Sequence, residues 1–584
     1  MTDYLPDPNH PRPLMTRAAW RDLSGTWEFA FDDAEVGLAE RWWELDELPL
    51  RVQVPFAYQY PLSGIDDQSI HEAVWYGLSF EPTEEERAHD LLLHFGAVDY
   101  ACTVWLNGVQ IGGNRGGHVP FSFDIKPYLR PGPNRLVLRV EDRQSEDQPR
   151  GKQSSTGIPK SCDYYCTTGI WQRVWLEPVA QQRFDVVKIV PHLNPDRLEV
   201  EVHLHAHAGN YRIEVYQKDI GRTKSYRLEG AASTRFTLEV PAGRRWTPET
   251  PNLIGLELRL FEESKLLDEI HTYAGVREAR VDGNRFLLNG EPTFLKMVLD
   301  QGYWPDGGMT PPDGEALRKD VEDTKAMGFN GARKHQKVED PRWLTWCDRL
   351  GLLTWGEMAN ARTWSFEAEE CFTAEWERAV RRDVSHPCVV TWVPINESWG
   401  LPDLGKTNGP QYAFLERLVL LTRRLDPSRP VIDNDGWEHT DVGDIAAIHD
   451  YTATGDGLRE RWGEGRLPER TWGKGSLAHF VGDAKYRGQP IVLSEVGGFL
   501  LVPEDVPQEE LDRLYQFYGS HRTPEELLAK YRDIMKGLAD IGVAGFCYTQ
   551  LTDIEQEING LLRYDRTPKV PLEAIKAIND ECFG

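Results

Sequence analysis

Residues 389–400 read VVTWVPINESWG and contain the most informative pair in the chain, Asn396 and Glu397. Apolar and β-branched residues lead up to this pair, which predicts a buried strand. The strand ends in an amide and a carboxylate, and the chain then turns at Gly400. Residues 490–498, PIVLSEVGG, repeat this design around Glu495. The sequence therefore predicts two carboxylates, each at the C-terminal tip of a buried strand.

Working outward from these segments, residues 282–584 alternate between short apolar strands and helical patterns. Eight strands are predicted, at residues 294–298, 330–335, 353–358, 389–395, 430–434, 445–451, 491–496 and 543–551. Helical patterns fall between most of them, for example at residues 315–327, 341–350 and 523–541. Eight strand–helix alternations within about 300 residues predict a (β/α)8 TIM barrel.

The first 281 residues have an all-β pattern. In residues 1–180, short apolar strands are separated by turn signals such as Asn107-Gly108, which predicts a β jelly-roll sandwich. In residues 181–281 the alternation is cleaner, with apolar residues at every second position from Leu198 to Leu204. About 100 residues of this kind predict an immunoglobulin-like β-sandwich. We therefore expect a multidomain protein with its barrel last.

Composition excludes several classes of partner. The chain has 584 residues, too many for one core, and a formal net charge of −27. That charge disfavours nucleic acid and anionic membrane surfaces. The N-terminal residues have no apolar signal core, and no run of about 18 apolar residues occurs. With eight scattered cysteines, read as reduced thiols, we expect a cytoplasmic protein that does not enter a membrane.

The two carboxylates suggest a specific chemistry. Counting predicted strands, Glu397 ends the fourth and Glu495 ends the seventh, so they face each other across the barrel mouth. A retaining glycosidase needs two carboxyls about 5–5.5 Å apart, one of them protonated because its ionised neighbour raises its pKa. We assign Glu397 as general acid/base and Glu495 as nucleophile, with Asn396 binding the sugar 2-hydroxyl.

Several further motifs carry a family resemblance. The segments are HFGAVDY at 94–100, VWLNG at 104–108, GHVPF at 117–121, TGIW at 168–171 and NRFLLNG at 284–290, followed by Asn396-Glu397 and Ser494-Glu495. In this order they resemble glycoside hydrolase family 2, the group of β-galactosidases, β-glucuronidases and β-mannosidases. The resemblance covers nearly the whole chain and implies that the jelly roll is of the sugar-binding type.

The resemblance also implies roles for five other residues. Asp163 would reach from the jelly roll to bind sugar hydroxyls, and Tyr451 would donate a hydrogen bond to the nucleophile. Arg333 and His335 would orient the nucleophile and the sugar, and Asp300 would bind a substrate hydroxyl. Each of these residues could instead have an ordinary structural role. Asp163 could cap a turn, and the residues at strand ends could pack in the core or form buried hydrogen bonds and ion pairs.

The last barrel strand departs from the glucuronidase pattern. Glucuronidases carry an Asn-x-Lys motif there, whose lysine pairs with the sugar carboxylate, whereas this chain has Glu557 and Asn559. An inward-facing Glu557 would repel a carboxylated sugar, which favours a neutral glycoside. Arg563 and Lys569 could still bind the carboxylate of a uronide, so a uronide remains an alternative substrate.

The sequence therefore predicts an exo-acting retaining β-glycosidase that cleaves terminal β-linked sugars, with a β-galactoside preferred. The alternatives are a β-uronidase, another specificity of the family such as mannoside or arabinopyranoside, and a non-catalytic carbohydrate-binding protein. Two carboxyls suffice for this chemistry, so we expect no cofactor and assign no metal ligands. The expected partner is a carbohydrate substrate, and the resemblance is compatible with a homo-oligomer.

Overall fold

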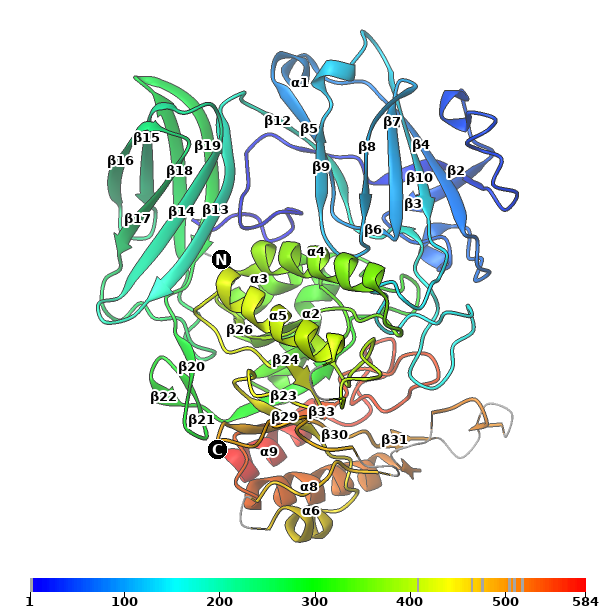
Figure 1. The fold of residues 1–584 in the computed structure, drawn as a ribbon, viewed down its shortest axis with the longest axis vertical. Coiled ribbons are helices and arrows are strands. Elements are labelled where there is room, and N and C mark those ends of the chain that lie inside the picture. The colour runs from blue at the N-terminus through cyan, green and yellow to red at the C-terminus, as the bar shows by residue number, and fades with distance from the viewer. Residues whose placement is uncertain are drawn as a thin grey trace.

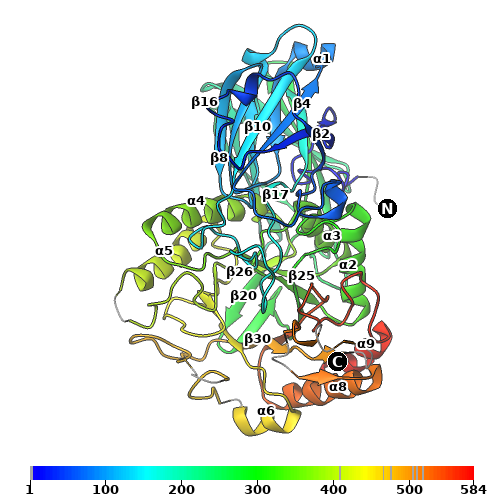
Figure 2. The same ribbon diagram turned by 90° about the vertical axis from the view of Figure 1, so that its right-hand side faces the viewer.

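The computed structural model describes residues 4–406, 409–463, 466–473, 477–502, 506–507, 511–515 and 519–584. Two β-sandwiches lie beside each other over a barrel, the first in blue at the upper right of Figure 1 and the second in green at the upper left. Figure 2 shows the same two-tier arrangement from the side. The predicted fold class is confirmed.

The first sandwich packs two antiparallel sheets. One sheet has the order β1 (Arg21–Asp22), β12 (Val174–Val179), β5 (Asp90–Phe95) and β9 (Phe121–Asp124). The other has the order β3 (Leu50–Val54), β2 (Gly25–Phe31), β4 (Ala73–Phe80), β10 (Asn134–Glu141), β7 (Ala101–Leu106) and β8 (Val109–Arg115). The predicted turn joins β7 to β8, because Asn107 and Gly108 adopt the positive φ angles, 54° and 82°, that this hairpin requires.

The second sandwich follows the predicted alternation. One sheet has the order β13 (Arg183–His192), β14 (Arg197–His205) and β17 (Ser233–Glu239). The facing sheet has the order β16 (Arg222–Ala231), β15 (Gly209–Gln217), β18 (Ile254–Glu262) and β19 (Lys265–Ala274). Leu198, Val200 and Val202 are buried between the sheets, as their period of two requires.

The barrel begins after a small antiparallel sheet of β20 (Ala279–Asp282), β21 (Arg285–Leu288) and β22 (Glu291–Pro292). Its main parallel sheet has the order β26 (Val389–Val393), β25 (Leu353–Glu357), β24 (Gly331–Lys334), β23 (Leu295–Asp300), β33 (Gly545–Thr549), β30 (Ile491–Gly497) and β29 (Ala446–His449). Bridges from Trp392 to Val431 and from Gly436 to Ile448 complete the circuit, together with the pair β27 (Ile395–Asn396) and β28 (Asn434–Asp435).

The fifth barrel strand is shorter than predicted. Pro430 has no N–H to donate, and the Val431 N–H donates to Asp444 Oδ2 at 2.8 Å instead of to a neighbouring strand. Residues 430–432 therefore form only a single bridge, from Val431 to Trp392, and a paired strand begins at β28.

The helices lie close to their predicted positions because their termini carry strong signals. Asp340 caps α3 (Pro341–Leu350), which ends at Gly351 in the left-handed conformation. Thr523 and Glu526 form a capping box on α8 (Pro524–Asp540). The other barrel helices are α2 (Gly314–Ala326), α4 (Phe366–Asp383), α5 (Pro410–Leu425), α6 (Gly455–Trp462) and α9 (Leu572–Phe583). Within the described ranges, none of the helices has the length and apolar character needed to cross a membrane.

One segment of the first sandwich leaves its own domain. Residues 142–168, which connect β10 to β11 (Gly169–Ile170) and which we call the reaching segment, descend to the barrel in cyan in Figure 1. The Gly151 N–H donates to the Asn360 carbonyl at 3.0 Å, and the Gln556 amide donates to the Asp163 carbonyl at 2.8 Å. The jelly roll therefore contributes side chains to the barrel mouth.

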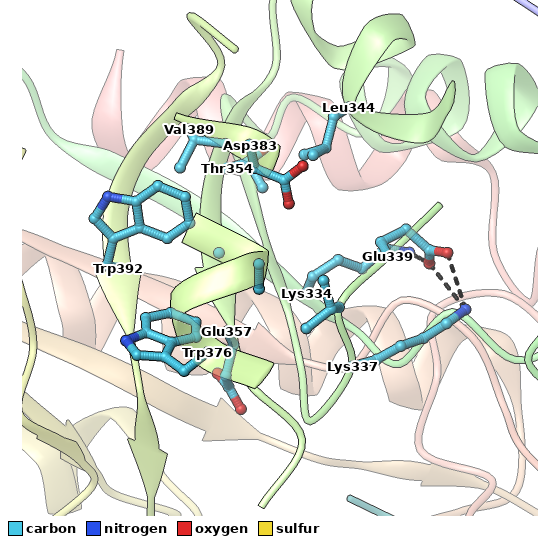
Figure 3. Close-up of a pocket in the computed structure, with 13 residues that line it drawn as sticks. Lys334, Lys337, Glu339, Leu344, Thr354, Glu357, Trp376, Asp383, Val389 and Trp392 are labelled. Carbon is cyan, nitrogen blue, oxygen red and sulfur yellow. Dashed lines mark hydrogen bonds and ion pairs between the residues drawn. The ribbon is translucent and has the colours of Figure 1, made fainter. Parts of the chain in front are cut away.

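A small cavity of about 20 Å³ lies among β25, β26 and α4. Figure 3 shows Trp376 and Trp392 on one side of it and Lys334 and Lys337 on the other. The volume is enough for about one water molecule and far too small for a sugar. The cavity is a packing defect of the barrel wall.

Candidate active site

Glu397 and Glu495 meet at the C-terminal mouth of the barrel. Glu397 directly follows β27, and Glu495 lies on β30. One oxygen of each carboxylate and a ring nitrogen of His449 lie within 4.8 Å of one another. This separation suits the double-displacement arrangement and is shorter than the inverting one requires.

The backbone at Glu397 adopts an unusual conformation. Glu397 and Ser398 have φ angles of 52° and 57°, in the left-handed region that side-chain-bearing residues seldom adopt. The Glu397 N–H donates to the Asp435 carbonyl at 2.8 Å, and the Ser398 N–H donates to Asn434 Oδ1 at 2.9 Å. These bonds hold a strained turn that aims Glu397 into the mouth, and such strain is concentrated at functional sites.

The Glu495 carboxylate accepts hydrogen bonds from two predicted residues, and a third lies nearby. The Tyr451 hydroxyl donates to Oε2 at 2.5 Å, and Arg333 Nη1 donates to Oε1 at 3.2 Å. His335 Nε2 lies 4.0 Å from Oε1. Burial first, and then the Arg333 charge, hold the pKa of His335 well below its usual value, so its imidazole is neutral. The structure thus brings Tyr451, Arg333 and His335 together around the proposed nucleophile.

Arg333 organises the floor of the site. It is fully buried, and its guanidinium contacts Glu357 Oε2 at 2.6 Å, Asp435 Oδ1 at 3.1 Å and Asn396 Oδ1 at 2.7 Å. Burial alone would lower the pKa of Arg333, but the charges of Asp435, Glu357 and Glu495 raise it well above its usual value. Arg333 therefore supplies a permanent positive charge to a cluster of largely buried acids.

Arg333→Met is expected to lower the free energy of unfolding by about 3–5 kcal/mol, because buried carboxylates lose their compensating charge. Chemical denaturation followed by tryptophan fluorescence measures this change. Arg381→Met is the matched control, since Arg381 is 63% exposed and pairs with Glu377 across one helical turn. We expect that substitution to cost less than about 1 kcal/mol. Equal losses in the two variants would contradict a special role for Arg333.

His449 connects the two proposed catalytic acids and was missed from the sequence. Its Nδ1 lies 2.8 Å from Glu397 Oε1 and 3.4 Å from Glu495 Oε2, while Nε2 lies 2.6 Å from Asp435 Oδ1. Burial opposes its charge, but Glu495, Asp435 and Glu397 raise the pKa of His449 to about 10. The ring is an imidazolium at neutral pH. Its position two residues before Tyr451, on the same face of a strand end, was the available signal.

This imidazolium overturns one expectation. The sequence predicted a raised pKa for Glu397, from the proximity of Glu495. Burial does raise the pKa of Glu397, but the hydrogen bond from His449 and the charges of His449, Lys152 and Arg333 outweigh it and leave the pKa below its usual value. The prediction was wrong because it counted the neighbouring acid and omitted the cations.

His449→Gln is therefore expected to raise the pKa of Glu397. A general acid must carry its proton, so the rate of glycoside cleavage falls as pH rises through that pKa. The basic limb of kcat/KM against pH should shift to higher pH in the variant. A nitrophenyl β-glycoside assayed across the pH range measures this shift. An unchanged limb, in a variant with the thermal stability of the parent, would show that His449 does not control Glu397.

Asn396 remains positioned to bind substrate. Its Oδ1 accepts from Arg333, whereas its buried Nδ2 has no hydrogen-bond partner among the described residues. A buried amide donor without a partner is costly, and a sugar hydroxyl would satisfy it.

Asp300 lies away from the mouth. In the parallel register Leu299 pairs with Arg333, and Asp300 pairs with Lys334. Side chains alternate along a strand, so Asp300 points to the face opposite Arg333, where Lys334 Nζ contacts its Oδ2 at 2.6 Å. This placement does not support the expected contact of Asp300 with a substrate hydroxyl.

The remaining predicted residues lie where the reaching segment meets the barrel. Asp163 forms an ion pair with Arg362. Glu557 accepts a hydrogen bond from the Tyr164 hydroxyl at 2.5 Å and another from Asn559 Nδ2 at 3.1 Å, so both of its oxygens are engaged. Burial raises the pKa of Glu557. The sequence predicted that Glu557 would repel a carboxylated sugar if it faced inward, and the structure shows this carboxylate held by two donors.

The sequence analysis also did not identify Arg362 and Lys152, two cations that contact the ring of Trp399. The Arg362 guanidinium lies 3.3 Å from the ring centroid of Trp399, and Lys152 Nζ lies 5.2 Å from the same ring. Lys152 belongs to the reaching segment, which has no strand or helix periodicity. No sequence pattern places it at the barrel mouth.

Comparison with known proteins agrees with this architecture. Residues 20–178 match the sugar binding domain model of glycosyl hydrolases family 2, residues 182–277 match the model named Glycosyl hydrolases family 2, and residues 279–497 match its TIM barrel domain. A putative β-glucuronidase from Formosa agariphila is 26% identical over 388 residues, covering 64% of this chain and 46% of that protein. A β-galactosidase from Thermoanaerobacter pseudethanolicus is 26% identical over 440 residues, which cover 70% of this chain and 53% of that protein. The chain thus spans about half the length of these curated relatives.

Solved structures resemble the chain along almost its whole length. A β-glucuronidase from Bifidobacterium dentium matches with a TM-score of 0.77 at 18% identity, covering 96% of this chain and 97% of that one. A β-galacturonidase from Eisenbergiella tayi matches with a TM-score of 0.74 at 19% identity, covering 97% of both. At this identity the likeness shows the fold. The three domain models together cover most of the chain in the expected order, and the protein therefore belongs to glycoside hydrolase family 2.

Proposed function

We propose that this protein is a retaining, exo-acting β-glycosidase in which Glu495 is the nucleophile and Glu397 the general acid/base. The observation that carries the proposal is the approach of the two carboxylates within 4.8 Å at the barrel mouth. A sugar between them would have one carboxylate below its anomeric carbon and the other beside its leaving oxygen.

The reaction follows in two steps. Glu495 attacks the anomeric carbon while Glu397 gives its proton to the leaving oxygen, which breaks the glycosidic bond and forms a glycosyl ester. Glu397 then takes a proton from water, whose oxygen attacks the same carbon and releases Glu495. Tyr451 and Arg333 orient the attacking carboxylate through the contacts described above, and the spare donor of Asn396 is available to the sugar.

The glycone is a separate question. A neutral β-galactoside was expected because Glu557 would repel a carboxylate. That argument weakens now that Tyr164 and Asn559 hold Glu557. The matched relatives include both β-galactosidases and a putative β-glucuronidase. Galactoside and uronide are therefore the two glycones to compare.

Proton NMR of the first-formed sugar tests the mechanism. A panel of nitrophenyl β-glycosides identifies the substrate, and the configuration of the fresh product is then recorded before it mutarotates. We expect the β-anomer first, because two inversions restore configuration. The α-anomer first would contradict the assignment of a nucleophile, and absence of turnover on every glycoside in the panel would contradict the proposed function.

A further inference from the structure

Lys152 is a buried cation for which the described residues provide no carboxylate partner. Its side chain is 7% exposed and lies over Trp399 in the barrel mouth. Within the described part of the chain, its ammonium has no carboxylate within 4.0 Å and donates no hydrogen bond. A lysine in that state is unusual, since buried charges are normally paired.

The other buried lysines in the described residues follow the normal rule. Lys334 contacts Asp300 at 2.6 Å and Glu339 at 2.8 Å. Lys337 and Lys569 likewise have carboxylate partners, at 3.0 Å and 2.5 Å. Lys152 is the exception among the four, and it is also the one that lies in the proposed sugar site. An anionic group of a ligand would supply the carboxylate partner that Lys152 lacks among the described residues.

The surroundings keep Lys152 charged and place it beside the sugar. Burial would lower the pKa of Lys152, but Cys162, Glu557, Glu495 and Glu397 together raise it above its usual value. Lys152 Nζ lies 5.2 Å from the ring of Trp399, which is two residues after Glu397 in the chain. An anionic substituent on the glycone ring is therefore the kind of group that would approach Lys152.

The neighbouring groups also tolerate an anion. Both oxygens of Glu557 accept hydrogen bonds, from Tyr164 and from Asn559, and neither lies within ion-pair distance of the Lys152 ammonium. The second cation on Trp399, Arg362, is occupied by Asp163. Lys152 therefore remains as the free positive charge of the cluster formed by Lys152, Trp399 and Arg362.

We propose that Lys152 binds a carboxylate on the glycone, so that the preferred substrate is a β-uronide and its charge is recognised by the jelly roll. This inference rests on the proposed glycosidase function. It assigns this task to a residue of the first domain, since Lys569 of the barrel loop is paired with Asp553 at 2.5 Å and Arg563 is exposed to solvent.

The test compares nitrophenyl β-glucuronide and β-galacturonide with nitrophenyl β-galactoside. The parent protein should give a higher kcat/KM for one of the uronides than for the galactoside. Lys152→Gln should lower kcat/KM for that uronide by about 100-fold, and the galactoside far less, because a buried ion pair with substrate is lost. Lys152→Arg should recover part of the preference. Lys160→Gln, an exposed lysine of the same segment, should keep the parental ratio.

The outcomes separate the two proposals. Turnover of the galactoside without a uronide preference leaves the glycosidase function intact and overturns the role of Lys152. Equal losses on both glycosides in Lys152→Gln also overturn it, because a structural lysine would act on every substrate. If that variant melts at a lower temperature than the parent, Lys152→Met decides, because methionine keeps an unbranched side chain over Trp399 and removes only the charge. It should lose the uronide preference and keep turnover of the galactoside, and a retained preference would overturn the role of Lys152.

Discussion

Glu495→Gln is expected to lower kcat/KM for aryl β-glycosides by at least about 10⁴-fold, because the amide cannot form the glycosyl ester. The substitution preserves shape and the contact with Tyr451, so the fold should survive. Steady-state kinetics measure the loss, and thermal melting checks the fold. Glu460→Gln, an exposed acid on α6, is the matched control and should retain parental activity.

A rescue experiment gives the role of Glu495 directly. In Glu495→Gly, azide can occupy the vacated space and attack the anomeric carbon from the nucleophile's side. One inversion then produces an α-glycosyl azide, whereas a double displacement produces the β-anomer. Formation of the β-azide in this variant, or parental turnover by Glu495→Gln, would refute the nucleophile assignment.

Glu397→Ala is expected to have an effect that depends on the leaving group. Loss of a general acid costs about 10²–10⁴-fold when the departing oxygen needs a proton. A phenyl β-glycoside should therefore lose most of its cleavage rate, while a dinitrophenyl β-glycoside, whose phenolate leaves unprotonated, should lose little in the first step. Single-turnover release of the two phenols measures this difference.

The second step in Glu397→Ala provides its own check. Without a general base, hydrolysis of the glycosyl ester becomes slow, and azide, which needs no deprotonation, should accelerate it and give the β-glycosyl azide. Equal losses for both leaving groups would show that Glu397 does not protonate the departing oxygen. An α-glycosyl azide from Glu495→Gly and a β-glycosyl azide from Glu397→Ala would identify the nucleophile and the general acid/base independently of each other.

Periodicity located the strand ends, and the family resemblance then indicated which side chains at those ends have roles in the site. Glu397, Glu495, Arg333 and Tyr451 all lie at C-terminal ends of barrel strands, and the structure brings them within reach of one another. Asp300 also lies at the C-terminal end of a barrel strand, but its side chain points to the face of the sheet opposite Arg333. Locating a strand end from apolar patterning leaves an uncertainty of about one residue, and a shift of one residue reverses the direction of a side chain.

Charge balance was harder to predict from sequence. His449 and Asp435 change the electrostatics of Glu397 through contacts that join three different strands. Lys152 reaches the site from another domain through a segment with no regular structure. Such contacts depend on tertiary packing, and no local pattern in the sequence encodes them.

The reaching segment ties catalysis to the docking of two domains. Residues 142–168 belong to the part of the chain that the ribosome makes first, yet they complete a site whose acids are made last. A barrel expressed alone would have both acids but lack the side chains that residues 142–168 bring to its mouth. Because this segment lies outside the barrel strands, insertions or exchanges in it can change the surroundings of the two acids during evolution without changing the strands that carry them.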